Sequence, residues 1–226
     1  MYEKEKVDFK SEGDFSSPLG VILKKAYDDA INDKFKISNE VLTMAGMSGK
    51  MYRKIINNLV EAMPDPRYLE TGSLKGSTVC SAMYGNKVKV GCIESWHWDW
   101  REEFKKNTDS VRTDDIDFNF FESDFRGVDY NNIGKYNIYM FDGPHSARDQ
   151  YDGVVFAQPA LDDNHILIID DWNWDEVRHG TWSAIQYLEL KVTSMLEVYT
   201  LNHSAENGNE QGDWHNGYLM AVIEKK

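Results

Sequence analysis

Residues 68–77, Tyr-Leu-Glu-Thr-Gly-Ser-Leu-Lys-Gly-Ser, carry the strongest structural signal in this 226-residue chain. A short apolar stretch containing Glu70 runs into two glycines four residues apart, and a helix-length segment, Ser77–Tyr84, follows. This pattern is typical of a strand, a tight turn and a helix, in which backbone N–H groups can approach an anion. The spacing differs from the G-x-G-x-x-G of a pyrophosphate loop, so it favours a smaller anion such as an amino-acid carboxylate.

The alternation of strand and helix continues along the chain. The five strand candidates are Tyr68–Gly72, Val88–Ser95, Phe118–Asp124, Asn137–Asp142 and His165–Asp170. They predict an α/β fold with a Rossmann-like, doubly wound and mostly parallel sheet that has helices on both faces. Two further strands, Met195–Leu201 and Tyr218–Ile223, are separated only by a polar loop at His203–Gly217. Because no helix fits in that loop, we expect this C-terminal pair to be antiparallel and to lie at the edge of the sheet.

The segment before the sheet is expected to be a helical appendage, 1–66, attached to the main domain, 67–226. The boundary is the Pro64-Asp65-Pro66 sequence, where two prolines prevent a helix from continuing. A helix is predicted from Ser48 as N-cap to Pro64, with apolar residues at the helical period: Met51, Ile55, Ile56, Leu59, Val60 and Met63. It could be a lid over a cofactor or a cover on one sheet face, and both alternatives stay open.

Composition limits the classes of partner. The chain has 25 basic and 38 acidic residues, so its net charge is −13, which disfavours binding to nucleic acid or to an anionic membrane. The charged N-terminus and the absence of 18 consecutive apolar residues favour a soluble, cytoplasmic protein. The only cysteines, Cys80 and Cys92, form no C-x-x-C pair, so no disulfide framework is expected. A homo-oligomer is left open.

Each predicted parallel strand carries a carboxylate at or near its end. These residues are Glu70, Glu94, Asp124, Asp142 and the pair Asp170-Asp171. In open α/β sheets ligands bind outside the carboxyl ends of the strands, so the acids mark one rim of the sheet as a binding site. Glu94 lies 22 residues beyond Gly72, the distance at which an acid reaches ribose hydroxyls in dinucleotide-binding folds. We therefore expect Glu94 to bind a ribose.

Together these motifs resemble the class I S-adenosylmethionine-dependent methyltransferases, and among them the metal-dependent O-methyltransferases of the macrocin and catechol types. The resemblance covers roughly Tyr68 to Lys226 and rests on Leu-Glu-Thr-Gly-Ser-Leu-Lys-Gly-Ser, Cys-Ile-Glu-Ser-Trp, Met-Phe-Asp-Gly-Pro-His-Ser, Ile-Ile-Asp-Asp-Trp and the terminal strand pair. It implies a cofactor site in which Glu94 holds the ribose and Asp124 approaches the adenine amino group. The other implied cofactor-binding residues are Glu70, Gly72, Ser73, Gly76, Ser77, Ser95 and Trp96. The family's loop often has a third glycine where this chain has Leu74.

The clustering of three of these carboxylates needs a separate explanation. Asp142, Asp170 and Asp171 would repel one another without a cation, whereas a divalent ion that prefers oxygen ligands would neutralise them. The resemblance also places metal ligands at these three positions, so we expect Mg²⁺ or another divalent cation there. The alternative is that Asp170 or Asp171 caps the next helix.

His145 follows Asp142 by three residues, so both are catalytic candidates, with His145 as the base that removes a proton from a substrate hydroxyl. His97 and His179 are weaker alternatives, and His165, His203 and His215 have no supporting neighbourhood. Among the tryptophans, Trp96 and Trp172 are expected to line the site more than Trp98 and Trp100, for which helix packing is the better explanation.

The preferred reading is methyl transfer from S-adenosylmethionine to a hydroxyl of a small molecule, a sugar or a phenol, with metal assistance. A nicotinamide-dependent oxidoreductase would use Glu94 in the same way but would leave the Asp170-Asp171 pair unexplained. A cofactor-binding or interaction module that has lost catalysis is the third alternative, because a fold alone does not imply activity.

Overall fold

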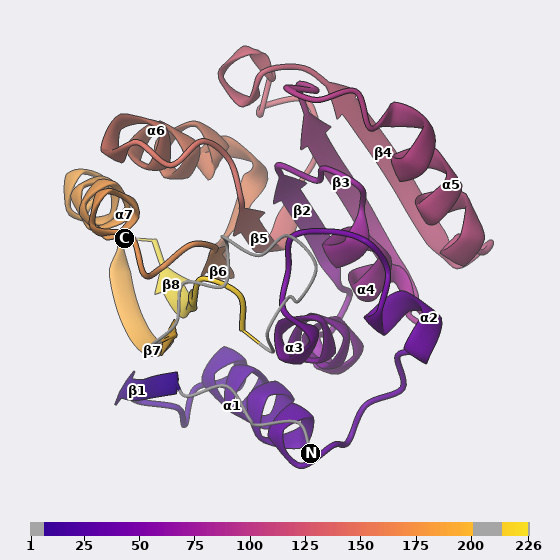
Figure 1. The fold of residues 1–226 in the computed structure, drawn as a ribbon. Helices are drawn as coiled ribbons and strands as arrows, with labels where there is room; N and C mark the ends of the chain where they lie inside the picture. Colours follow the sequence, from indigo (N-terminus) through magenta and orange to yellow (C-terminus); the bar gives the residue numbers. More distant parts are fainter. Residues whose placement is uncertain (1–6, 201–213, 226) are drawn as a thin grey trace.

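The computed structural model describes residues 7–200 and 214–225, which form an eight-stranded sheet between helical layers (Figure 1). The strands are β1 (Val7–Gly13), β2 (Arg67–Thr71), β3 (Val88–Glu94), β4 (Ile116–Glu122), β5 (Tyr136–Phe141), β6 (Leu161–Ile169), β7 (Lys191–Thr200) and β8 (Tyr218–Glu224). Their order across the sheet is β1-β7-β8-β6-β5-β2-β3-β4, and β2 to β6 are mutually parallel. The α/β, Rossmann-like, doubly wound fold is confirmed.

The C-terminal strands pair antiparallel, as expected, but they do not form the edge of the sheet. β8 lies between β6 and β7, and β1 pairs antiparallel with β7 and takes the edge position. The sequence gives little sign of β1 because its seven residues, Val-Asp-Phe-Lys-Ser-Glu-Gly, are mostly polar and exposed. The N-terminal segment is therefore not purely helical. Most of the predicted loop at His203–Gly217 falls outside the described residues.

Helices cover both faces of the sheet. On one face α1 (Pro18–Ile31), α3 (Lys50–Ala62), α4 (Ser77–Met83) and α5 (Arg101–Val111) pack in a row, and α2 (Asn39–Leu42) contacts α3 and α4 (Figure 1). On the other face α6 (Ala147–Ala157) packs against α7 (Asp175–Tyr187). Short 3-10 turns follow β4 and α6, at Phe125–Gly127 and Gln158–Ala160. No helix in the described ranges is long and apolar enough to cross a membrane.

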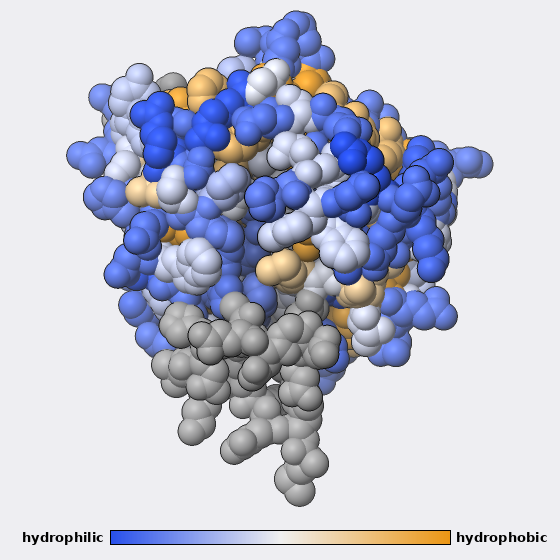
Figure 2. Space-filling view, turned by 45° about the horizontal axis from the view of Figure 1, so that its top comes forward, coloured by the Kyte–Doolittle hydropathy of each residue, from blue (hydrophilic) through white to orange (hydrophobic). Residues whose placement is uncertain are grey.

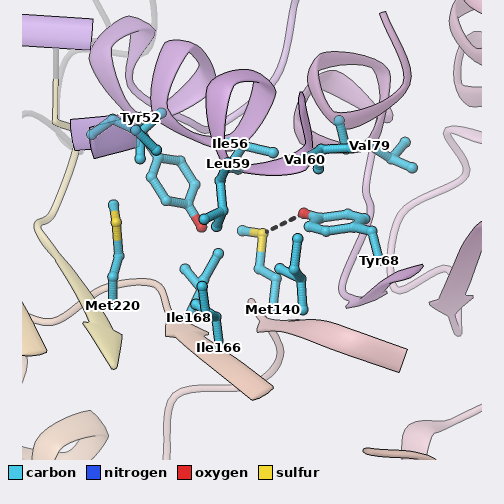
Figure 3. Close-up of a cluster of buried hydrophobic side chains, with 14 of the residues drawn as sticks. Tyr52, Ile56, Leu59, Val60, Tyr68, Val79, Met140, Ile166, Ile168 and Met220 are labelled. Atoms are coloured by element: carbon cyan, nitrogen blue, oxygen red, sulfur yellow. Dashed lines mark hydrogen bonds between the residues drawn. The ribbon is translucent and has the colours of Figure 1, made fainter. Parts of the chain in front are cut away.

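Helix α3 covers the sheet, which agrees with the second alternative for this segment. Its buried face, with Tyr52, Ile56, Leu59 and Val60, lies over side chains of the central strands (Figure 3). Those strand residues are Tyr68, Met140, Ile166, Ile168 and Met220. The residues before 67 thus contribute to the main core, and the division of the chain at residue 66 stays a prediction.

The predicted N-cap of α3 is wrong by one residue. Gly49 occupies the cap position without a side-chain hydrogen bond, and the helix ends before Pro64, as expected. The hydroxyl of Ser48 instead accepts a hydrogen bond from Nε of Arg53, at 2.8 Å.

The outer surface is mainly hydrophilic on the face shown in Figure 2, which agrees with the low mean hydropathy of −0.59.

The binding crevice follows from the order of the strands. After β2 the chain adds β3 and β4 on one side, and then crosses to add β5 and β6 on the other. Ligands in doubly wound folds bind at such a switch point, outside the carboxyl ends of the two strands. Here the turn after β2 touches the end of β5: a Cβ on Gly72 would lie 1.7 Å from the carbonyl oxygen of Asp142, and Gly72 has a φ of +87°. Only glycine permits this approach.

The contact can be tested with Gly72→Ala. We expect this substitution to lower the free energy of unfolding by more than about 3 kcal/mol, because it combines an unfavourable φ with overlap against backbone. Gly85→Ala is the matched control: Gly85 also has a positive φ, +64°, but its Cβ would meet only ordinary contacts at 3.4 Å or more. Urea unfolding should show a loss of only about 1–2 kcal/mol for that control. Equal losses in the two variants would contradict a special contact at Gly72.

Candidate functional site

Three of the predicted site residues meet just beyond β5 and β6. One ligand atom each from Asp142, His145 and Asp171 lies within 4.8 Å of the others, and we call these residues the Asp-His-Asp cluster. Nε2 of His145 is 2.7 Å from Oδ2 of Asp171. The hydrogen bond to Asp171 raises the pKa of His145, against the opposing effect of burial. The carboxylate of Asp171 therefore favours the protonated form of the His145 imidazole.

Asp170 lies beside this cluster but is not part of it. Its carboxyl group is buried, and its Oδ1 has no hydrogen-bond partner among the described residues. Burial, followed by the charge of Asp171, raises the pKa of Asp170 well above its ordinary value. Burial and the charges of Asp170 and Asp171 act in the same direction on Asp142. Of the three predicted metal ligands, Asp142 and Asp171 thus meet His145, and Asp170 lies close enough for its charge to raise the pKa of Asp142.

Asp171 differs from its two acidic neighbours. Burial by itself would raise its pKa, but hydrogen bonds from His145 and Asn216 outweigh burial and lower it. The amide nitrogen of Asn216 lies 2.6 Å from Oδ1 of Asp171. Neither Asp170 nor Asp171 caps a helix, because α7 begins after Trp174. The helix-cap alternative is therefore wrong.

One aromatic ring packs against His145: Trp174 lies edge-on, with ring centroids 4.5 Å apart. His215 lies near the cluster. Its Nε2 is 3.5 Å from the amide nitrogen of Asn216, burial lowers its pKa, and the charges of Asp171 and His145 also act on it. Sequence reasoning gave His215 no role. Its position in the sequence does offer one signal. His215 lies three residues before β8, β8 pairs with β6, and β6 leads into Asp170 and Asp171.

The glycine turn and Glu94 form the second half of the site. Both carboxylate oxygens of Glu94 accept backbone hydrogen bonds at 2.8 Å, one from N–H of Leu74 and one from N–H of Trp96. Leu74 and Trp96 adopt left-handed φ values of 46° and 58°, so the carboxylate stabilises two strained turns at once. Leu74 therefore takes the conformation that a glycine favours. The structure places Glu94 directly beside the turn at Gly72–Gly76.

Glu70 and Ser73 lie deeper than the sequence suggested. The Glu70 carboxylate is fully buried on the α4 side of the sheet and accepts a hydrogen bond of 2.5 Å from the hydroxyl of Tyr68. Burial raises the pKa of Glu70 to about 7. Oε1 of Glu70 and the hydroxyl of Ser73 are buried without a hydrogen-bond partner in the described structure. These two unpaired polar atoms lie at the glycine turn, where a ligand with complementary polar groups would satisfy them.

The remaining cofactor candidates are spread along the same rim. Ser77 begins α4 after Gly76, and its hydroxyl lies 3.1 Å from that of Ser48. Ser95 is exposed just after Glu94. Asp124 is exposed beyond the end of β4, where its carboxylate accepts a hydrogen bond from N–H of Arg126 and caps the 3-10 turn. No hydrogen bond among the described residues brings Asp124 to the glycine turn.

The tryptophans behave differently from the expectation. Trp172 is fully buried and donates its indole N–H to Glu197 at 2.8 Å, so it is a core residue and does not line the site. Trp98 and Trp100 are exposed, not packed under helices. Trp96 is half-buried against Phe104 and Phe120. The expectation that Trp172 lines the site while Trp98 and Trp100 pack under helices is therefore wrong. Trp96 does lie beside Glu94.

The structure describes three further histidines. His97 and His179 are exposed, and His203 falls outside the described residues. His165 is buried in β6, where its Nδ1 lies 2.9 Å from the carbonyl oxygen of Asp162, and burial lowers its pKa to about 4. Its environment is that of a core residue.

The pair of His145 and Asp171 has a defined pH dependence. Because the pKa of His145 is raised on folding, the pair stabilises the fold below the unfolded-state pKa of histidine, and this contribution disappears as pH rises through the folded-state pKa. It also disappears as pH falls through the lowered pKa of Asp171. In metal-free protein, an NMR titration should give a lower pKa for His145 in Asp171→Asn than in the unsubstituted chain. Asp149→Asn, which removes a weaker influence, should lower it less, and an unchanged value in Asp171→Asn would contradict the pairing.

No protein-family model matches the sequence, and no curated protein matches it. Solved structures do match its fold. An O-methyltransferase from Bacillus cereus, solved in complex with SAH, has a TM-score of 0.54 and 11% identity, with 90% of this chain and 91% of that chain covered.

A protein from Pyrococcus horikoshii, proposed to be an RNA methyltransferase, has a TM-score of 0.55 and 13% identity, covering 90% of this chain and 97% of that chain. TrmN from Thermus thermophilus has a TM-score of 0.56 and 13% identity over 82% of this chain, which spans only 52% of the TrmN chain. At these identities the likeness shows the fold alone. The chain has the Rossmann-like fold found in class I methyltransferases.

Proposed function

We propose that this chain is an S-adenosylmethionine-dependent methyltransferase that methylates a hydroxyl group of a small molecule with the help of a divalent cation. The observation that carries the proposal is the junction at the switch point: the glycine turn is hydrogen-bonded to Glu94 and touches the end of β5, where the Asp-His-Asp cluster begins. One half suits a nucleoside bearing an amino acid, and the other would suit a divalent cation next to an acceptor hydroxyl. The complex of the Bacillus cereus enzyme with SAH supports the same choice of cofactor.

The residues of the glycine turn fit the cofactor. Gly72 and Gly76 both have positive φ values, so the backbone can come close to a ligand without side chains in between. The unpaired hydroxyl of Ser73 offers a hydrogen bond to the amino-acid end. Glu94 already lies at the turn, and its carboxylate has lone pairs left to accept ribose hydroxyls.

The Asp-His-Asp cluster fits a divalent cation through its two carboxylates, because a hard divalent ion prefers oxygen ligands. Asp142 and Asp171 would hold the ion. Asp170, whose Oδ1 has no hydrogen-bond partner among the described residues, lies close enough for its charge to act on Asp142. A bound divalent ion would act as a Lewis acid that lowers the pKa of an acceptor hydroxyl. It would also relieve the repulsion that raises the pKa of Asp142.

Within this proposal His145 removes the acceptor proton. It must be neutral at Nε2 to do so, yet Asp171 favours the protonated imidazole. A cation that engages Asp171 would weaken that pairing and favour the neutral ring. Trp174 limits the orientations of the imidazole by packing against it.

A sugar or phenol hydroxyl is the acceptor class that we favour, because the net charge of −13 opposes binding to an RNA backbone. The nicotinamide-dependent oxidoreductase and the inactive module remain as alternatives. Thermal-shift measurements with SAH, NAD and Mg²⁺ distinguish the ligands: a methyltransferase of this type is stabilised by SAH and Mg²⁺, an oxidoreductase by NAD, and a module that binds no cofactor by none. An inactive module that still binds SAH is distinguished by the absence of methyl transfer.

The ribose assignment is tested by calorimetry with SAH. We expect Glu94→Ala to weaken binding at least about tenfold, because hydrogen bonds to a charged acceptor contribute roughly 1.5–3 kcal/mol. Glu122→Ala is the control, since Glu122 pairs with Glu94 in register at the end of the neighbouring strand but is exposed and bound to Arg101. The control should bind normally. Unchanged binding by folded Glu94→Ala would remove the ribose assignment.

The metal assignment is tested by titrating Mg²⁺ and Mn²⁺ into the protein by calorimetry. Asp142→Asn and Asp171→Asn should each reduce affinity at least about tenfold, because each replaces a charged oxygen ligand by a neutral one. Asp149→Asn removes a nearby carboxylate outside the cluster and should leave affinity unchanged. A strong chelator should abolish methyl transfer to any acceptor that is found. Full turnover in the chelator would place the chain with metal-independent enzymes of this fold.

A further inference from the structure

Arg53 is a buried cation that donates hydrogen bonds to the end of α2 and to the segment just before its own helix. Its side chain, on α3, is 1% exposed. Nε donates to the hydroxyl of Ser48 at 2.8 Å, and Nη1 donates to the carbonyl oxygens of Met44 at 2.6 Å and Leu42 at 3.1 Å. Burial lowers the pKa of Arg53 to about 10. The guanidinium therefore organises the backbone that connects α2 to α3.

Burying a guanidinium costs free energy unless its donors are satisfied in a fixed geometry. An apolar residue would cover the sheet at this position at lower cost, as Ile56 does on the same helix. What Arg53 adds is a planar set of donors that matches several carbonyl oxygens at once. This arrangement fits a role in holding the connection from Met44 to Gly49, which we call the α3 approach segment.

The α3 approach segment is attached to both halves of the candidate site. On one side the hydroxyl of Ser48 lies 3.1 Å from that of Ser77, the first residue of α4 after the glycine turn. On the other side N–H of Gly49 donates to the hydroxyl of Tyr218 at 3.4 Å, and burial together with the charges of Asp170 and Asp142 raises the pKa of that tyrosine. The segment thus lies between the start of α4 and a tyrosine that is close to two carboxylates of the candidate site.

Packing leaves little freedom in this segment. A Cβ on Gly46 would lie 2.1 Å from the hydroxyl oxygen of Ser77, so the backbone lies directly against the start of α4. Gly46, Ser48 and Gly49 are buried, whereas the side chain of Met47 between them is 50% exposed. The exposed apolar side chain of Met47 therefore lies between backbone positions that are buried and closely packed.

We propose that Arg53 is a positioning residue for the cofactor site: it holds the α3 approach segment as a wall against which the amino-acid end of the cofactor packs. The inference rests on the proposed function, because it takes S-adenosylmethionine as the ligand at the glycine turn. Arg53 itself acts through Ser48 and the backbone of the segment, without touching the reacting atoms.

The test compares SAH binding by calorimetry in three variants. Arg53→Lys keeps the charge but loses the planar donor set, and we expect it to weaken SAH binding at least tenfold. Ser48→Ala removes only the link between Arg53 and Ser77, and we expect a loss of about threefold to fivefold. Asn58→Ala is the matched control, because Asn58 also lies buried on α3 and donates to a backbone carbonyl, that of Lys34 at 2.9 Å, away from the site. It should bind SAH within twofold of the unsubstituted chain.

Hydrogen exchange supplies a readout that a merely structural role would not move. SAH should slow amide exchange in residues 44–49 of the unsubstituted protein and of Asn58→Ala, and should fail to do so in Arg53→Lys. Normal SAH affinity in both Arg53→Lys and Ser48→Ala would overturn the inference. So would an equal loss of affinity in Asn58→Ala, or SAH binding that depends on Glu94 but leaves exchange in residues 44–49 unchanged. Failure of the unsubstituted protein to bind SAH would instead overturn the proposed function.

Discussion

The contact between Gly72 and the carbonyl group of Asp142 is the constraint on which the rest of the site depends. It joins the turn after β2 to the end of β5 at the switch point of the sheet. At this point the chain stops adding strands on one side of β2 and begins to add them on the other. The turn is held on its other side by Glu94, and the end of β5 leads into His145. The close contact between these two backbone positions thus sets the distance between the two halves of the site, one suited to a nucleoside and the other to a cation.

Much of this arrangement was predictable because strand-end residues are constrained by topology. Apolar runs of strand length identify β2 to β6, and parallel strands bring their carboxyl ends to one rim. Glu94 and the cluster formed by Asp142, His145 and Asp171 follow from that rule. What the rule does not give is the direction of each side chain, so Asp170 lies outside the group formed by Asp142, His145 and Asp171, and Trp172 lies in the core.

The features that sequence reasoning missed lack a local pattern. β1 is too polar to stand out as a strand, and it is recognised only through its pairing with β7. Arg53 falls among the apolar residues of α3, where an arginine is ordinarily exposed. His215 reaches the site because β8 inserts between β6 and β7, a long-range pairing that no short stretch of sequence encodes.

The polar character of β1 also bears on how copies of the chain can associate. β1 and β4 are the two edge strands of the sheet. Charged residues alternate along β1, at Asp8, Lys10 and Glu12, and such charges on an edge oppose the addition of another strand. A sheet that continues from one molecule into the next is therefore disfavoured at this edge.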